Sequence, residues 1–143
     1  MTKKLKITII AVIIVLLLIA IAGLIKYNSL FGAPQKQAEP ERFIVSLNST
    51  ENDVIQKLLD DGFIKSELGF KFVLGRKNWQ GKFEPGGYKI AKNMNAWKIA
   101  EVIVGEPYMK WVIIPEGLRK EEIGEILAEE LGWNEQQKNR FTI

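Results

Sequence analysis

The sequence contains no cysteine and no histidine among its 143 residues. Without cysteine, the chain has no disulfide, no thiolate ligand for a metal and no lipid attached through an N-terminal cysteine. Without histidine, the Ser-His-Asp triads of hydrolases and the common zinc sites are excluded as well. The sequence also lacks a phosphate-binding glycine loop, a nucleophile elbow and a metal-ligand cluster, so we expect no cofactor and no metal.

Charged residues are missing from one long stretch near the N-terminus. Residues 7–25 are uncharged and almost all Ile, Val, Leu or Ala. At ~1.5 Å rise per residue they reach about 28 Å, close to the ~30 Å hydrocarbon core of a bilayer, so they predict a transmembrane helix. The alternative is a cleaved signal peptide, which Ala20-Ile21-Ala22 favours and the length of the apolar run disfavours. Both interpretations export the rest of the chain.

The basic residues are unevenly distributed. Four of the 20 flank the apolar stretch without any acid among them, at Lys3, Lys4, Lys6 and Lys26. The remainder of the chain therefore carries 16 basic and 17 acidic residues, a net charge of −1. The positive-inside tendency predicts a single-pass protein of the cell (inner) membrane, with residues 1–6 as a cytoplasmic tail and the C-terminal part extracytoplasmic. A nearly neutral body gives no reason to expect nucleic acid as a partner.

Capping residues and apolar patterns predict a small α+β domain after a polar, proline-containing linker at residues 26–42. The expected order is a strand from Phe43, a helix capped by Thr50 and ended by Gly62, a helix capped by Ser66 and ending near Gly75, a strand from Gly86 to Ile90, and a helix capped by Asn95 that stops at Gly105. The residues expected to face inward are Val54, Ile55, Leu58 and Leu59, then Leu68, Phe72 and Val73, then Ile99, Val102 and Ile103.

The last part of the sequence predicts a strand from Trp111, a turn after Pro115 and an amphipathic helix from Arg119 to about Leu131. That helix has an acidic outer side and is stable chiefly through its packed face. The residues after it indicate the beginning of another helix. We therefore expect residues 107–143 to be the start of a second domain.

Aromatic and basic residues alternate between Lys65 and Lys98, where the only acids are Glu67 and Glu84. Aromatic faces beside cationic side chains suit a glycan, or the headgroups of anionic lipids. The candidate glycan contacts are Trp79, Phe83, Tyr88, Trp97, Arg76 and Lys77. Trp79 is the best of them because it lies in a polar, glycine-containing loop. The alternative interpretation makes Tyr88 and Trp97 core residues and the lysines a solvated surface.

Two motifs separated by a single helix carry a family resemblance: "GGYKI" at residues 86–90 and "VIIPEG" at residues 112–117. Together with the apolar N-terminal stretch, they make the chain resemble the N-terminal part of the YceG-like family of membrane-anchored endolytic murein transglycosylases. The motif residues are structural landmarks in this comparison, namely Gly86, Gly87, Tyr88, Pro115, Glu116 and Gly117. Glu116 at a helix start is expected to complement the helix dipole and to have no catalytic role.

The resemblance implies a LysM-like βααβ module at residues 43–106 and a truncated YceG-like catalytic domain from residue 107. It also implies cleavage inside peptidoglycan strands, with one carboxylic acid protonating the leaving oxygen while the sugar's own hydroxyl closes an anhydro ring. The family's general-acid glutamate belongs to a later motif that this sequence does not contain. We therefore predict no catalytic residue here and no activity of this chain alone.

The partners implied are peptidoglycan glycan strands, the lipid bilayer and cell-wall synthesis proteins. The alternative function is a non-catalytic, membrane-tethered module that binds peptidoglycan or proteins of the division machinery. A reading frame that continues into the acid-bearing motif favours the enzyme, and a stop codon after Ile143 favours the binding module.

Overall fold

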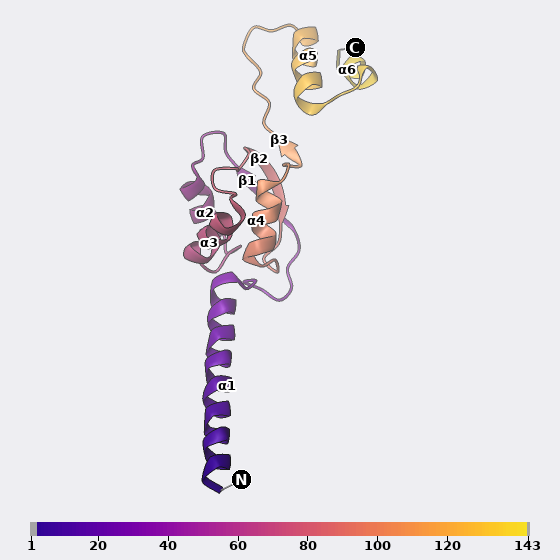
Figure 1. The fold of residues 1–143 in the computed structure, drawn as a ribbon. Coiled ribbons are helices and arrows are strands. Elements are labelled where there is room, and N and C mark those ends of the chain that lie inside the picture. Colours follow the sequence, from indigo (N-terminus) through magenta and orange to yellow (C-terminus); the bar gives the residue numbers. More distant parts are fainter. Residues whose placement is uncertain (1–2, 143) are drawn as a thin grey trace.

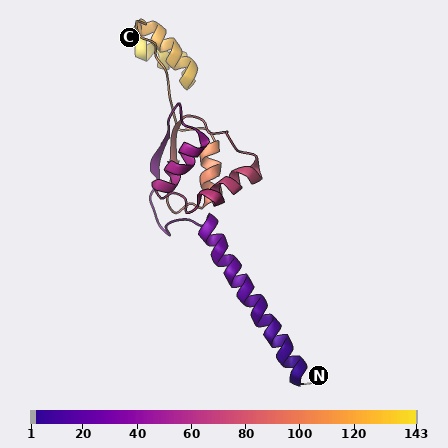
Figure 2. The same cartoon turned by 90° about the vertical axis from the view of Figure 1, so that its left-hand side faces the viewer.

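A long helix, a small mixed domain and a helical hairpin follow one another in the computed structural model, which describes residues 3–142 (Figure 1). The elements are α1 (Lys3–Phe31), β1 (Glu41–Val45), α2 (Glu51–Asp60), α3 (Glu67–Lys77), β2 (Gly86–Ile90), α4 (Ala96–Val104), β3 (Met109–Lys110), α5 (Lys120–Leu131) and α6 (Glu135–Thr142). Figure 2 shows α1 leaving one end of the mixed domain and the α5–α6 hairpin standing at the other. The predicted mixture of helices and strands, and the order strand-helix-helix-strand-helix, are confirmed.

The core of the chain lies in the βααβ domain, by which we mean residues 41–104, from β1 through α4. Its strands β1 and β2 pair antiparallel, with Phe43 opposite Tyr88, and the short β3 extends the sheet on the other side of β2. The buried cluster consists of Phe43, Val45, Val54, Ile55, Leu58, Phe63, Ile64, Phe70, Val73, Leu74, Tyr88, Ile90, Ala96, Ile99, Ala100 and Ile103. Every element of the βααβ domain thus contributes to one apolar core.

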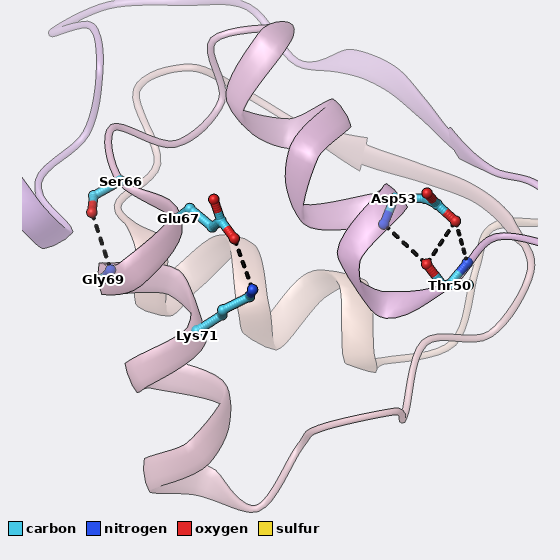
Figure 3. Close-up of polar contacts among 6 residues, drawn as sticks. All are labelled: Thr50, Asp53, Ser66, Glu67, Gly69 and Lys71. Atoms are coloured by element: carbon cyan, nitrogen blue, oxygen red, sulfur yellow. Dashed lines mark hydrogen bonds and ion pairs between the residues drawn. The ribbon is translucent and has the colours of Figure 1, made fainter.

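The helices of this domain begin at the capping residues that the sequence predicts. Thr50 and Asp53 form a reciprocal capping box, in which the Thr50 N–H donates to Asp53 Oδ2 at 2.8 Å and the Asp53 N–H donates to Thr50 Oγ1 at 3.2 Å (Figure 3). The Ser66 hydroxyl accepts from the Gly69 N–H at 3.1 Å. Such bonds satisfy amides that have no partner inside the helix, which fixes where α2 and α3 start.

The orientation of α3 differs from the prediction. Val73 is buried as expected, but Leu68 and Phe72 are 76% and 58% exposed, and Phe70 and Leu74 are buried instead. The sequence of α3 has apolar residues on several sides, so periodicity alone does not select the face that packs inward. The exposed pair forms an apolar surface on the outside of the domain.

The predicted linker at residues 26–42 is only partly a linker. Helix α1 continues without a break to Phe31, and β1 begins at Glu41. Gly32 and Pro34 follow the helix end, where a helix-breaking sequence is expected. Met1 and Thr2, which begin the predicted cytoplasmic tail, lie outside the described residues, and α1 already includes residues 3–6.

The segment after α4 also departs from the prediction. The extended pairing stops at Lys110, so Trp111 to Ile114 form no strand, and Ile113 is 69% exposed. The Trp111 indole N–H instead donates to the carbonyl of Val45 at 3.0 Å. Helices α5 and α6 form where the sequence predicts them and pack against each other as a hairpin, with Gly124 buried beside Thr142.

Candidate functional site

An open groove of about 470 Å³ lies between the end of α3 and the first turns of α4. It contains two tryptophan rings with charged and amide side chains around them. The lining residues are Lys77, Trp79, Asn95, Trp97, Lys98 and Glu101. We call this feature the tryptophan groove. It brings together three of the predicted glycan contacts, Trp79, Trp97 and Lys77.

The C-terminal cap of α3 sets the position of Trp79. Asn78 takes the left-handed conformation, with φ of 55°, which asparagine tolerates better than most residues. Its N–H donates to the carbonyl of Gly75 at 3.2 Å, and the Trp79 N–H donates back to the carbonyl of Leu74 at 2.9 Å. This pair of bonds is the Schellman arrangement, which reverses the chain and holds the Trp79 backbone against the end of α3.

The Trp79 side chain is half-buried. It packs against the core cluster, while the Lys77 ammonium lies 5.6 Å from the centroid of its ring. A buried position for Trp79 was not evident from its polar loop, and the structure shows that the ring is partly buried against the core. A ring held by packing on one side loses little freedom when a ligand stacks on it, which favours binding.

The other wall of the tryptophan groove belongs to the start of α4. Asn95 caps this helix by accepting from the Lys98 N–H at 2.9 Å, and Trp97 follows in its first turn. The Trp97 ring lies 6.0 Å from that of Phe31 at the end of α1. Its indole N–H is buried without an acceptor among the described residues. Because such a donor costs about 1–3 kcal/mol, an oxygen that reached it would gain a bond that the free protein lacks.

The charges in the groove are mixed. The Lys98 ammonium lies 2.9 Å from a Glu101 carboxylate oxygen and forms an exposed ion pair with it. The Lys77 ammonium lies over the Trp79 ring and has no carboxylate partner among the described lining residues of the groove, so these residues carry a net positive charge. The arrangement offers stacking surfaces, amide and carboxylate acceptors, and ammonium donors, which is a binding site rather than a set of reacting groups.

The remaining predicted contacts lie elsewhere. Arg76 is exposed on α3 outside the groove, and Phe83 packs partly buried against the core cluster. Tyr88 is 1% exposed, so we remove it from the set of glycan contacts, in agreement with the alternative interpretation. Its hydroxyl donates to the Glu84 carbonyl at 2.7 Å, and burial, with the Glu84 charge second, raises the pKa of Tyr88 to about 12. Tyr88 is therefore a neutral core residue.

The motif residues occupy turns and close backbone contacts. A Cβ at Gly86 would lie 2.5 Å from the Pro107 Cβ and 2.6 Å from the Met109 carbonyl oxygen, so the pairing of β2 with β3 needs glycine there. Glu116 is exposed in a turn with Gly117, whose φ is +85°. Within residues 3–142 no group of three acidic, histidine or cysteine side chains gathers as a metal site.

The predicted set of glycan contacts did not include three groove residues, Asn95, Lys98 and Glu101. Asn95 was identified only as a helix cap, Lys98 only as the last basic residue of the aromatic and basic stretch, and Glu101 was not singled out. A signal was available for Glu101, which is four residues from Trp97 and three from Lys98, because residues three and four apart lie on one helix face. The sequence does not show that this face of α4 lies close to the loop that carries Trp79.

The fold defines a small mixed domain at the end of one long apolar helix, and within the described residues that helix, over Ile7–Phe31, has the length and composition to cross a membrane. The sequence model of the YceG-like family matches residues 43–142, which is well over half of the chain, and the chain belongs to this family. No curated protein and no solved structure gives a significant match.

Proposed function

We propose that this chain anchors and positions an endolytic peptidoglycan transglycosylase on glycan strands close to the membrane. The chain belongs to the YceG-like family, and its α1 helix has the properties of a membrane anchor. The observation that carries the proposal is the tryptophan groove, where Trp79 and Trp97 face a common space with cationic neighbours. The βααβ domain then serves as the LysM-like module of the family.

The chemistry of the groove suits an amino-sugar chain. The apolar faces of pyranose rings stack on indole rings, as apolar surfaces do with aromatic faces. Sugar hydroxyls and acetamido groups can bond to Asn95 and Glu101, and the acidic groups of peptidoglycan can meet Lys77 or Lys98. A site of this kind binds the strand without cleaving it, so catalysis in this proposal belongs to the family's acid-bearing motif.

The place of the groove relative to α1 supports action on nascent strands. Trp97 contacts both the groove and Phe31, so the binding site begins where the anchor helix ends. In the proposed orientation, the N-terminus is cytoplasmic and the βααβ domain lies outside. A glycan strand leaving its synthetic enzyme at the membrane surface would meet this groove first.

The test is co-sedimentation of the full chain, in detergent micelles, with purified peptidoglycan. We expect Trp79→Ala to weaken binding about tenfold, which corresponds to roughly 1.4 kcal/mol of lost stacking. Lys77→Ala should weaken it several-fold without touching the core, and Arg76→Ala is the matched control outside the groove. Mass spectrometry of the supernatant should show no anhydro-sugar product.

Each result has one meaning. Weaker binding of the Trp79 and Lys77 variants, with Arg76→Ala unchanged and all melting curves alike, supports the groove as the glycan site. Equal binding by every variant would exclude the groove, and no binding by the unaltered chain would remove the glycan role from this domain. An anhydro product would contradict our assignment of catalysis to the later motif.

A further inference from the structure

The junction between α1 and the βααβ domain is rigid. The Leu30 backbone packs so closely on Gly69 of α3 that a Cβ there would collide with the Leu30 carbonyl. The Phe31 ring lies 5.7 Å from that of Phe72 and also contacts Trp97. After the helix, the Gln35 N–H donates to the Lys92 carbonyl at 2.9 Å. The domain is therefore held directly against the helix end and not suspended from a flexible tether.

This rigidity fixes the height of the domain above a membrane. If residues 7–25 fill the ~30 Å hydrocarbon core, Phe31 lies six residues further along the helix, about 9 Å at ~1.5 Å per residue. A bilayer with its headgroups is about 40–45 Å thick, so each headgroup layer is about 5–8 Å deep and Phe31 lies just outside it. Elements that pack against Phe31 thus lie at the bilayer surface.

Helix α3 packs there through Gly69 and Phe72, and it exposes two large apolar side chains. Leu68 and Phe72, one helical turn apart, are 76% and 58% exposed. Figures 1 and 2 show α3 at the end of the domain nearest to the top of α1. Tyr27, whose ring is 5.0 Å from that of Phe31, continues the aromatic surface down the anchor helix. Aromatic side chains are enriched at the membrane interface, where an apolar body meets a wet edge.

Positive charge lies beside these apolar side chains. A pocket of about 430 Å³ at the junction is lined by polar and small residues with Lys36 and Lys65, and no carboxylate is among its described lining residues. The Lys65 ammonium lies 3.4 Å from the Asn28 carbonyl at the end of α1, which keeps it next to the helix. Two ammonium groups at headgroup height are complementary to lipid phosphates.

We propose that α3 seats on the surface of the bilayer that holds α1, with Leu68 and Phe72 in the headgroup layer and Lys36 and Lys65 against lipid phosphates. This inference rests on the proposed membrane anchoring. Its consequence is that the tryptophan groove is held at one height and one orientation relative to the lipid. With α1 spanning the bilayer and α3 lying on its surface, the domain has a fixed orientation. With α1 alone, it could still rotate about the helix axis.

Because the chain has no cysteine, labels can be placed at single sites of the full protein. The test uses Leu68→Cys and Phe72→Cys, each labelled with an environment-sensitive fluorophore, in vesicles of phosphatidylcholine with or without phosphatidylglycerol. Asn52→Cys on α2 is the control for the exposed side of the domain, and Leu17→Cys reports insertion of α1. Quenching by lipids spin-labelled near the headgroup or deep in the acyl chain measures depth.

We expect the labels at Leu68 and Phe72 to be blue-shifted and quenched several-fold more strongly by headgroup-labelled lipid than the label at Asn52. Lys65→Glu should reduce that quenching in the anionic vesicles only, whereas Lys110→Glu on β3 should not. If the label at Leu17 is quenched deeply but those on α3 behave like Asn52, the seating is wrong and the anchoring stands. If the label at Leu17 is not quenched by acyl-chain probes, the membrane anchoring itself fails.

Discussion

At the scale of single residues, the four tryptophans of the chain show how side chains of one kind take different places. Trp79 and Trp97 line the groove, Trp111 bonds to the backbone of β1, and Trp133 packs against α6. The polar loop around Trp79 predicted an accessible ring, and the ring lies half-buried at the groove. Trp97 could equally have been a core residue, and it proves to lie between the core and the groove.

The capping box of α2 makes the stability of the folded chain depend on pH in the acidic range. The hydrogen bonds from the side chain and backbone of Thr50 hold the pKa of Asp53 below its ordinary value of 3.8. A carboxylate whose pKa is lower in the folded state stabilises that state above the ordinary value, and this stabilisation is lost as the pH falls through the folded pKa. We expect Asp53→Asn to flatten the acid limb of the melting temperature against pH below about 4.

The control for that prediction is a cycle with Thr50→Val. This substitution removes the hydroxyl that bonds to the Asp53 carboxylate, so it should flatten the same limb. Because the Thr50 N–H still donates to Asp53 in this variant, the flattening should be partial, and both substitutions together should change the limb no further than Asp53→Asn alone. Additive effects would show that Thr50 and Asp53 act separately.

Gly86 is a position where any side chain should be costly. An added Cβ meets the Pro107 ring and the Met109 carbonyl at distances that real Cβ atoms do not adopt. We expect Gly86→Ala to lower the free energy of unfolding by about 1–3 kcal/mol, as overpacking typically does. Gly75→Ala, inside α3 and near only the flexible end of Gln80, should be neutral or stabilising. Equal stability of the two variants in thermal melts would contradict this account.

At the scale of elements, the starts of the helices in the βααβ domain were predictable because their signal is local. Thr50, Ser66 and Asn95 each satisfy an amide three residues later, and nothing distant is needed for that. The signal for the strand at Gly86 to Ile90 was equally local. The turn sequence before it and the apolar residues within it were sufficient.

Substitutions at the capping positions of α3 and α5 should have opposite effects on stability, because Ser66 makes a side-chain cap bond and Arg119 does not. Ser66→Ala should destabilise α3 by about 1 kcal/mol because the Gly69 N–H loses its acceptor. At α5 the Arg119 N–H donates to Glu122 at 2.7 Å, but Arg119 makes no side-chain cap bond in return. Arg119→Ser should therefore stabilise α5 by about 0.5–1 kcal/mol. Amide hydrogen exchange in the two helices measures both changes in stability. A more stable α3 in Ser66→Ala, or a less stable α5 in Arg119→Ser, would refute the assignment of these caps.

Three features could not be predicted because they depend on contacts between distant segments. The outward orientation of Leu68 and Phe72 follows from which side of α3 meets α4. The pairing of β3 ends at Lys110 even though the apolar run continues to Ile114. The extension of α1 through residues 26–31 is stabilised by Phe31, which packs against rings from α3 and α4.

At the scale of the whole molecule, that extension makes the connection between α1 and the βααβ domain a rigid support in place of a flexible linker. The family resemblance predicts the order of parts, but it says nothing of how α1 meets the βααβ domain. The decisive contact is between two backbones, at Leu30 and Gly69, where a glycine makes close approach possible. Such a contact leaves no periodicity or motif in the sequence.

Gly69→Ala should loosen this junction while leaving the core intact. The new methyl group collides with the Leu30 carbonyl, so the end of α1 must move away from α3. We expect spin labels at Leu24→Cys and Gln56→Cys, in the full chain in nanodiscs, to give a broader distance distribution in this variant. Gly75→Ala in the same helix is the control. Distributions of equal width in the two variants would contradict the rigid support.

The central claim is that glycan binds in the tryptophan groove of a membrane-held domain. The most direct measurement follows the four indole N–H signals by NMR, in nanodisc-embedded chain, as soluble peptidoglycan fragments are added. The account predicts that the signals of Trp79 and Trp97 shift with a common affinity while those of Trp111 and Trp133 stay in place. Shifts confined to Trp111 or Trp133, or no shift at saturating fragment, would contradict it.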